Sequence, residues 1–175
     1  MNSLRWLFYC ALIVCSPAVH AACAGSTRDD GHRFALTAGE VFDVKTNLTW
    51  RRCSVGMVWK AGTGCAGTRA QFDWGAAGMA AIDAGPGWRL PNVAELASLL
   101  DASCGTPAVN TALFPDIGGS DEDENAYWTT SKVGVANLIY FVDFSNGDVD
   151  GHSKGFHLAV RLVRTFVPAR QPTMK

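Results

Sequence analysis

The chain has 175 residues, of which 48% are apolar and 18% charged, with 15 Lys and Arg against 16 Asp and Glu. This length suits a single domain, and the apolar fraction is too high for an intrinsically disordered chain. A net charge near zero argues against a general nucleic-acid-binding protein, which would be basic.

Residues 1–22 are typical of a secretory signal peptide. Arg5 precedes an apolar run over residues 7–14, which is too short to cross a bilayer as a helix. No later apolar stretch reaches membrane length, so we expect no transmembrane segment in the mature chain. We predict an exported protein, periplasmic or at the cell surface, with one domain over residues 23–168 and a tail over 169–175.

Four cysteines remain after the signal: Cys23, Cys53, Cys65 and Cys104. An even number in an exported protein predicts two disulfides, and the sequence leaves three pairings open. The short glycine-containing segment between Cys53 and Cys65 favours that pair, with Cys23 bonded to Cys104. In the alternative interpretation, Ala21-Ala22-Cys23 is the end of a lipobox and Cys23 carries a lipid anchor.

The first third of the domain alternates strands with turns. We predict strands over residues 33–36, 41–44 and 48–53, with a turn over 45–47. A glycine-rich loop over residues 56–67 follows, closed by the expected Cys53–Cys65 bond.

Two helices are predicted next. Asp73 can cap the first, and Gly85-Pro86-Gly87 ends it. The second begins after Pro91, where Asn92 and Glu95 have the spacing of a capping box. Its core-facing stripe consists of Val93, Leu96, Leu99 and Leu100.

The last third is predicted to be β. Strands are expected over residues 127–131, 138–144 and 157–167, and the middle one is apolar on both faces, as in a central strand. Ser145-Asn146-Gly147-Asp148 is typical of a hairpin turn. Strands, then two helices, then strands predict an α+β fold with a mainly antiparallel sheet.

Five short motifs occur in order within residues 33–166: Val41-x-Asp43-x-Lys45-Thr46-x-Leu48-x-Trp50, Trp88-Arg89-Leu90-Pro91-x-x-x-Glu95-Leu96, Tyr127-Trp128-Thr129-Thr130-Ser131, Val142-Asp143-Phe144-x-x-Gly147 and Val160-Arg161-Leu162-Val163-Arg164. Together they resemble the family of the Legionella collagen-like adhesin C-terminal domain, the Lcl C-terminal domain family. The resemblance implies an exported bacterial domain with a C-type-lectin-like fold, related also to formylglycine-generating enzymes.

In the adhesin, the family domain binds sulfated glycosaminoglycans and trimerises. The signal peptide holds one Arg and no acidic residue, so the mature chain has 14 basic against 16 acidic residues. This balance departs from that of a heparin-binding protein, and the sulfated ligand is therefore not carried over.

The motif residues are interpreted as structural. Arg89 is expected to reach a carboxylate or the carbonyls of a loop. Arg161 lies on an apolar strand and needs a partner, for which Glu95 and Asp101 are the candidates, because an unpaired buried charge is costly. The full structural set is Trp50, Trp88, Arg89, Leu90, Pro91, Glu95, Trp128 and Arg161.

Two acidic segments raise the question of calcium. Asn146, Asp148 and Asp150 with Gly151 match the start of a calcium loop, but His157 stands where such a loop has a bidentate Glu. These three residues are weak metal candidates, against the alternative of a solvated turn. Asp121-Glu122-Asp123-Glu124 is expected in an exposed loop. No cofactor is predicted, with calcium kept as an alternative.

Ligand binding is expected from loops over residues 54–69, 116–126 and 145–155. Exposed aromatic residues can stack on sugars and basic residues can hold anionic groups. The candidates are Trp59, Arg51, Arg52, Lys60 and Tyr127.

These observations predict a non-enzymatic binding module of the bacterial envelope or surface that recognises glycan, without nucleic acid as a partner. None of the three histidines of the mature chain lies in a catalytic or metal motif. The alternative is a periplasmic or surface accessory protein that binds another protein, such as an appendage component. Either module could be an oligomer.

Overall fold

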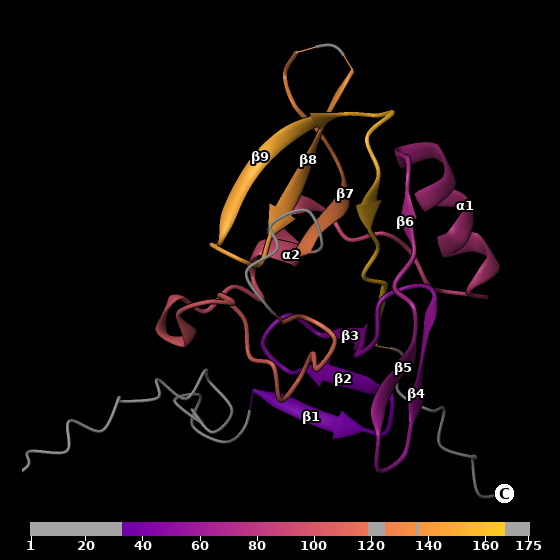
Figure 1. Ribbon diagram of the computed structural model, residues 1–175, viewed down its shortest axis with the longest axis vertical. Coiled ribbons are helices and arrows are strands. Elements are labelled where there is room, and N and C mark those ends of the chain that lie inside the picture. Colours follow the sequence, from indigo (N-terminus) through magenta and orange to yellow (C-terminus); the bar gives the residue numbers. More distant parts are fainter. Residues whose placement is uncertain (1–32, 119–124, 136, 167–175) are drawn as a thin grey trace, which may run out of the picture.

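The structure, a computed structural model, describes residues 33–118, 125–135 and 137–166. Within these ranges it contains a four-stranded sheet, a five-stranded sheet, a separate two-stranded hairpin and two α-helices. Figure 1 shows β1–β3 at one end of the molecule, β7–β9 at the other, and α1 on the flank beside β6. The α+β class predicted from the order of elements is confirmed.

The four-stranded sheet contains β1 (Phe34–Thr37), β2 (Glu40–Asp43), β3 (Leu48–Arg51) and β11 (Val163–Thr165), in that order and antiparallel throughout. Asn47 takes a φ of 56° in the turn between β2 and β3, a conformation that asparagine tolerates better than most residues. The three predicted elements of this region are therefore confirmed.

The five-stranded sheet has the order β6-β10-β7-β8-β9. Its pairs are antiparallel except for β10 and β7, which are parallel. β8, predicted as a central strand, is paired on both sides. The strands are β6 (Gln71–Phe72), β7 (Ala126–Lys132), β8 (Leu138–Asp143), β9 (Asp148–Ser153) and β10 (Leu158–Ala159).

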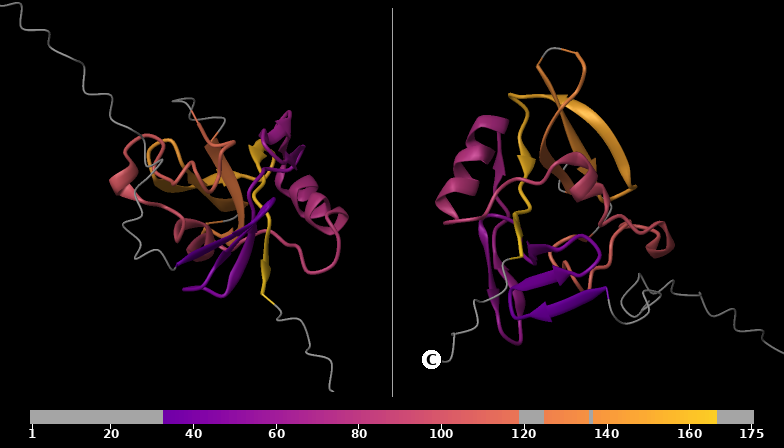
Figure 2. Two further views of the ribbon diagram at one scale, coloured as in Figure 1. Left: turned by 90° about the horizontal axis from the view of Figure 1, so that it is seen from below. Right: turned by 180° about the vertical axis from the view of Figure 1, so that it is seen from behind.

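Two sequence predictions about β structure are wrong. Residues 157–167 do not form one strand: β10 belongs to the five-stranded sheet and β11 to the four-stranded sheet, so the chain changes sheets over residues 160–162. Figure 2 shows this C-terminal segment, in yellow, running from one sheet toward the other. The glycine-rich segment 56–67 is a hairpin of β4 (Met57–Lys60) and β5 (Gly64–Gly67), not a loop.

Gly56 permits this hairpin to leave β3. Its φ is 91°, and a Cβ placed there would lie 2.5 Å from the carbonyl oxygen of Thr68. A side chain would both strain the backbone and collide with the returning chain. The disulfide between Cys53 and Cys65 then ties the hairpin to the end of β3.

Both helices begin where predicted. α1 (Trp74–Asp83) is capped by the Asp73 carboxylate, which accepts from the Ala76 amide. α2 (Val93–Ala97) is shorter, and Asn92 and Glu95 form the complete capping box. A 3₁₀ turn, η1 (Ala102–Cys104), follows. In the described part of the chain, no helix is both long and apolar enough to cross a membrane.

The core consists of two clusters, one on either side of the five-stranded sheet. The first joins that sheet to α2 and to the inner face of the four-stranded sheet, through Trp50, Leu96, Tyr127 and Phe144 among others. The second joins it to α1, through Ala77, Trp128 and Leu158 among others. Leu96 on α2 is buried in the core as predicted, and Leu99 is buried too, although the helix ends before it at Ala97.

Replacing Asn92 by alanine is expected to lower the free energy of unfolding by about 1 kcal/mol. The Asn92 side chain accepts from the Glu95 amide at 2.8 Å, and the substitution leaves that donor without its cap. Urea denaturation followed by tryptophan fluorescence measures the change. An unchanged midpoint would show that the cap contributes nothing to stability.

Candidate functional site

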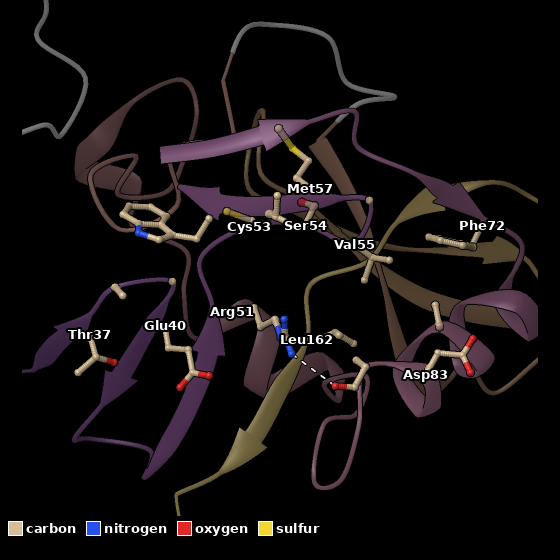
Figure 3. A pocket seen from close by; sticks show the side chains of 17 residues that line it. Thr37, Glu40, Arg51, Cys53, Ser54, Val55, Met57, Phe72, Asp83 and Leu162 are labelled. Carbon is tan, nitrogen blue, oxygen red and sulfur yellow. Dashed lines mark hydrogen bonds between the residues drawn. The ribbon is translucent and has the colours of Figure 1, made fainter. Parts of the chain in front are cut away.

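The described structure contains an open groove of about 660 Å³. It lies between the edge of the four-stranded sheet, the β4–β5 hairpin and the C-terminal half of α1, as Figure 3 shows from close by. Its volume falls within the range of small-ligand sites, ~300–1,000 Å³. The lining combines apolar side chains with a few polar ones: Thr37, Ala38, Gly39, Glu40, Arg51, Cys53, Ser54, Val55, Gly56, Met57, Val58, Trp59, Phe72, Ala80, Asp83, Ala84 and Leu162.

Trp59 supplies an aromatic wall to this groove. It lies on β4 directly opposite Cys65, so the disulfide is next to it in the hairpin. The Arg52 guanidinium lies 3.8 Å from the centre of its ring. The indole is half-buried and held in place, which suits a residue that presents a fixed apolar surface to a sugar ring.

Three charged side chains line the groove. Arg51 and Glu40 face each other across the β2–β3 pairing, and Asp83 lies on the last turn of α1. Arg51 donates to the Ala84 carbonyl at 3.4 Å, which places its guanidinium between the sheet and the helix (Figure 3). Glu40 accepts from Arg164 at 2.6 Å. The polar groups therefore converge from the sheet and the helix on one space.

Trp88 packs against two of the arginine side chains at the groove. The guanidiniums of Arg51 and Arg164 each lie 4.6 Å from the centre of its ring, and it is only 9% exposed. Cation–π contacts of this kind stabilise by about 0.5–2 kcal/mol. Trp88, interpreted from the sequence as structural, thus also positions Arg51 in the groove.

A buried polar network fixes residues 51–54, which form one wall of the groove. The Arg161 guanidinium donates to Asp116 at 2.8 Å, and both side chains are fully buried. It also donates to the carbonyls of Arg51 and Arg52 and to the Ser54 hydroxyl. The Asp116 carboxylate accepts from the Ser54 amide at 2.7 Å. The segment that follows β3 is therefore fixed by an ion pair.

The predicted partners of Arg161 were wrong. Glu95 pairs with Arg89 at 2.7 Å, as the capping-box geometry brings the two together. The Asp101 carboxylate caps η1 through the Ser103 amide. Asp116 takes the place opposite Arg161 because the change of sheet at residues 160–162 turns the guanidinium toward the segment after Phe114.

The electrostatics of this network follow from its burial. Burial alone would raise the pKa of Asp116, but the charge of Arg161 and the hydrogen bonds from Ser54 and Arg161 outweigh it, so the pKa lies below the ordinary value. The same burial raises the pKa of the Tyr127 hydroxyl. Asp116 is therefore ionised and Tyr127 neutral throughout the physiological range.

The structure divides the predicted ligand residues. Trp59 and Arg51 line the groove. Lys60 is exposed on the same hairpin but outside the lining. Arg52 is 9% exposed and donates to the carbonyls of Ala38, Ala112 and Leu113, so the prediction that it meets a ligand is wrong.

Tyr127 is also wrongly predicted as a ligand residue. It is 0% exposed, and its hydroxyl lies 2.9 Å from the Ser54 hydroxyl within the buried network. Arg69, which follows the disulfide hairpin, donates to the Asp116 carbonyl and is not among the residues that line the groove. Residues that are close in the sequence therefore have side chains in different parts of the fold.

The metal candidates lie in a hairpin. The Asn146 amide donates to Asp148 at 2.8 Å within the turn, and Asp150 is on the extended strand β9. Among residues 33–118, 125–135 and 137–166, no group of three His, Cys, Asp or Glu side chains is arranged to hold a metal ion. The acidic segment 121–124 lies outside the described residues.

The predicted disulfides are tested in part. The Cys53–Cys65 bond is confirmed, and Cys104 is disulfide-bonded as well. Its predicted partner, Cys23, and the signal peptide over residues 1–22 lie outside the described residues.

Sequence reasoning missed Glu40 and Asp83. Glu40 lies opposite Arg51 because β2 pairs with β3 across the turn at Asn47, whereas the predicted strand began one residue later, at residue 41. Asp83 gave no signal of its own, because an exposed carboxylate on the last turn of a helix is ordinary. Only the packing of α1 beside the hairpin brings it to the groove.

Comparison with known proteins identifies the family. Among curated proteins no relative matches the chain. The model of the Lcl C-terminal domain matches residues 39–164, which include every element from β2 to β10 and most of β11. These residues hold the whole groove except its rim at β1, Thr37 and Ala38. The chain therefore belongs to the Lcl C-terminal domain family.

Proposed function

We propose that this protein is an exported, non-enzymatic binding module of the bacterial envelope or surface, with a C-type-lectin-like fold, that recognises glycan in the groove. The family is that of an adhesin's C-terminal domain, which supports a surface-associated binding role. The observation that carries the proposal is the groove itself. It sets a fixed tryptophan beside Arg51, Glu40 and Asp83 in one concave space.

This combination suits a carbohydrate. Sugar rings offer an apolar face for stacking and hydroxyls at the rim that both donate and accept. Trp59 supplies the apolar surface, the carboxylates accept and the Arg51 guanidinium donates. Charge-assisted hydrogen bonds of this kind are among the stronger polar contacts in a binding site.

A binding role also agrees with the chemistry of the lining. The Ser54 hydroxyl lies next to Tyr127 and Arg161, neither of which is a general base at neutral pH, and Cys53 is bonded to Cys65. His152 lies between Phe141 and Phe156 on the five-stranded sheet, outside the groove lining. Among the described lining residues, Ser54 and Cys53 therefore offer no activated nucleophile.

A protein partner is the second candidate. Met79 and Ile82 on the outer face of α1 are 58% and 68% exposed, and Val58 at the groove is 60% exposed. Exposed apolar side chains beside a polar cavity are common where another protein docks. Envelope crosslinking from a photoreactive residue at position 82 would detect such a partner.

A glycan array probed with the purified protein, in calcium and again with chelator, tests the proposal. We expect binding that persists with chelator, because the groove recognises its ligand through side chains alone. The Trp59→Ala variant should lose most of the signal, at least tenfold. The Phe156→Ala variant, which removes an exposed aromatic outside the groove, is the matched control. Absence of binding in either condition would leave the protein-partner function.

A further inference from the structure

Resting on the proposed function, we infer that the groove selects uncharged glycans and rejects sulfated or other polyanionic ones. The charges at the groove support this selectivity, as do the partners that the described arginines already bind.

The groove carries no excess of positive charge. Its lining holds two carboxylates, Glu40 and Asp83, against one guanidinium, Arg51, and the Arg164 guanidinium beside the groove neutralises Glu40. A polyanion entering it would approach the Asp83 carboxylate, for which no described residue provides an ion pair. Asp83 is exposed, and a polyanion brought close to its carboxylate would be repelled.

The other arginines are held by the protein itself. Three pair with carboxylates: Arg33 with Asp43, Arg89 with Glu95 and Arg161 with Asp116. Arg52 and Arg69 donate to backbone carbonyls. Arg164 is next to the groove, and Glu40 neutralises it at 2.6 Å.

Only Arg51 among the groove residues presents a positive charge, and its position limits what it can bind. Its guanidinium lies over Trp88 and reaches the Ala84 carbonyl, so it offers a few donors in a fixed plane. A sulfated chain gains its affinity from several cations along its length. A single guanidinium between two carboxylates is suited instead to one or two hydroxyl groups.

Uncharged sugars suit these groups, because their hydroxyls can both donate and accept. A pair of neighbouring hydroxyls can donate to the Asp83 carboxylate and accept from Arg51, while the ring packs on Trp59. The ligand class inferred is a neutral oligosaccharide of hexose or N-acetylhexosamine units.

The test compares neutral and sulfated probes on the same protein. Purified protein is titrated with fragments of glucan, galactan, mannan and chitin and with heparin fragments of equal length, at low and high salt. We expect at least one neutral series to bind at least tenfold more tightly than heparin, with little salt dependence. Tighter binding of heparin that weakens with salt would overturn the inference and leave glycan recognition standing. Binding of neither class would overturn both.

Two variants assign the effect to the groove. Asp83→Asn removes the unpaired carboxylate and should weaken neutral binding about tenfold, as one charge-assisted hydrogen bond is lost. Asp83→Lys should weaken neutral binding further and raise heparin binding. Asp150→Asn, an exposed carboxylate on β9 outside the groove, is the matched control and should leave both unchanged. Unaltered neutral binding in Asp83→Asn and Asp83→Lys would overturn the assignment of selectivity to this carboxylate.

Discussion

Replacing Asp116 by alanine is expected to lower the free energy of unfolding by about 3–5 kcal/mol, the range for a buried ion pair that loses one partner. The substitution leaves the Arg161 guanidinium, which is 0% exposed, without its carboxylate in the interior. It also removes the acceptor of the Ser54 amide. Chemical denaturation followed by tryptophan fluorescence measures the loss.

The matched control for Asp116 is Glu40→Ala. Glu40 and Arg164 form an equally short ion pair, but their side chains are 32% and 39% exposed. Exposed pairs contribute only about 0–1 kcal/mol because water and salt screen them. A loss below 1 kcal/mol in Asp116→Ala, equal to that of the control, would contradict the burial of the Arg161–Asp116 pair.

The double variant Asp116→Leu with Arg161→Met separates the ion pair from the fold. Removing both charges leaves no unpaired ion, so we expect it to be more stable than Asp116→Ala. The carbonyls of Arg51 and Arg52 then lose their donor, and the groove wall should loosen. The free energy of glycan binding should therefore decrease by more than the free energy of unfolding, each relative to the native chain. Equal decreases in the two free energies would show that the pair acts on stability alone.

The Asp116 carboxylate also makes stability depend on pH. Its folded-state pKa is lowered, as are those of Asp43 beside Arg33 and Glu95 beside Arg89. The stabilisation from each is complete above the unfolded pKa, about 4, and is lost as the pH falls through the folded value. Stability of the native chain should thus decrease below about pH 4, and less so in the double variant.

Replacing Cys53 and Cys65 by serine is expected to lower the free energy of unfolding by about 3 kcal/mol, the value for closing a short loop. The bond spans 12 residues and connects the hairpin to the end of β3. β4 and β5 pair only with each other, so the bond is a cross-link that adds to the main-chain connections between this hairpin and the rest of the protein.

The loss should be concentrated in the groove. Hydrogen exchange is expected to rise over residues 57–67 well before it rises in β7 and β8, because an isolated two-stranded hairpin is only marginally stable. Trp59 should become more exposed and glycan binding should decrease. Uniformly faster exchange across both sheets, with the hairpin no more affected than β8, would contradict this role for the bond.

Several features follow from the sequence alone because they depend on neighbours in the chain. The capping residues Asp73 and Asn92, the turn at Asn47 and the Cys53–Cys65 bond all involve short separations. Local geometry decides such features, so residue type and spacing suffice to predict them. The α+β class was predicted from the order of strands and helices, and the family from the order of the five motifs.

The tertiary structure alone decided the site. Arg51 and Arg52 are adjacent, yet one lines the groove and the other is buried against backbone carbonyls. Tyr127 is of a residue type that often contacts ligands, but its hydroxyl is buried in the network of Arg161 and Ser54. Which face of a strand is buried depends on what packs against it, and the sequence of the strand does not carry that information.

The same reason explains the segment after β10. Its alternation of apolar residues predicted one continuous strand, whereas the chain leaves one sheet and enters another within three residues. That change of sheet turns Arg161 toward Asp116, 45 residues away in the chain. The sequence thus determined the elements, their caps and the family, while long-range packing decided which charges meet and where the groove opens.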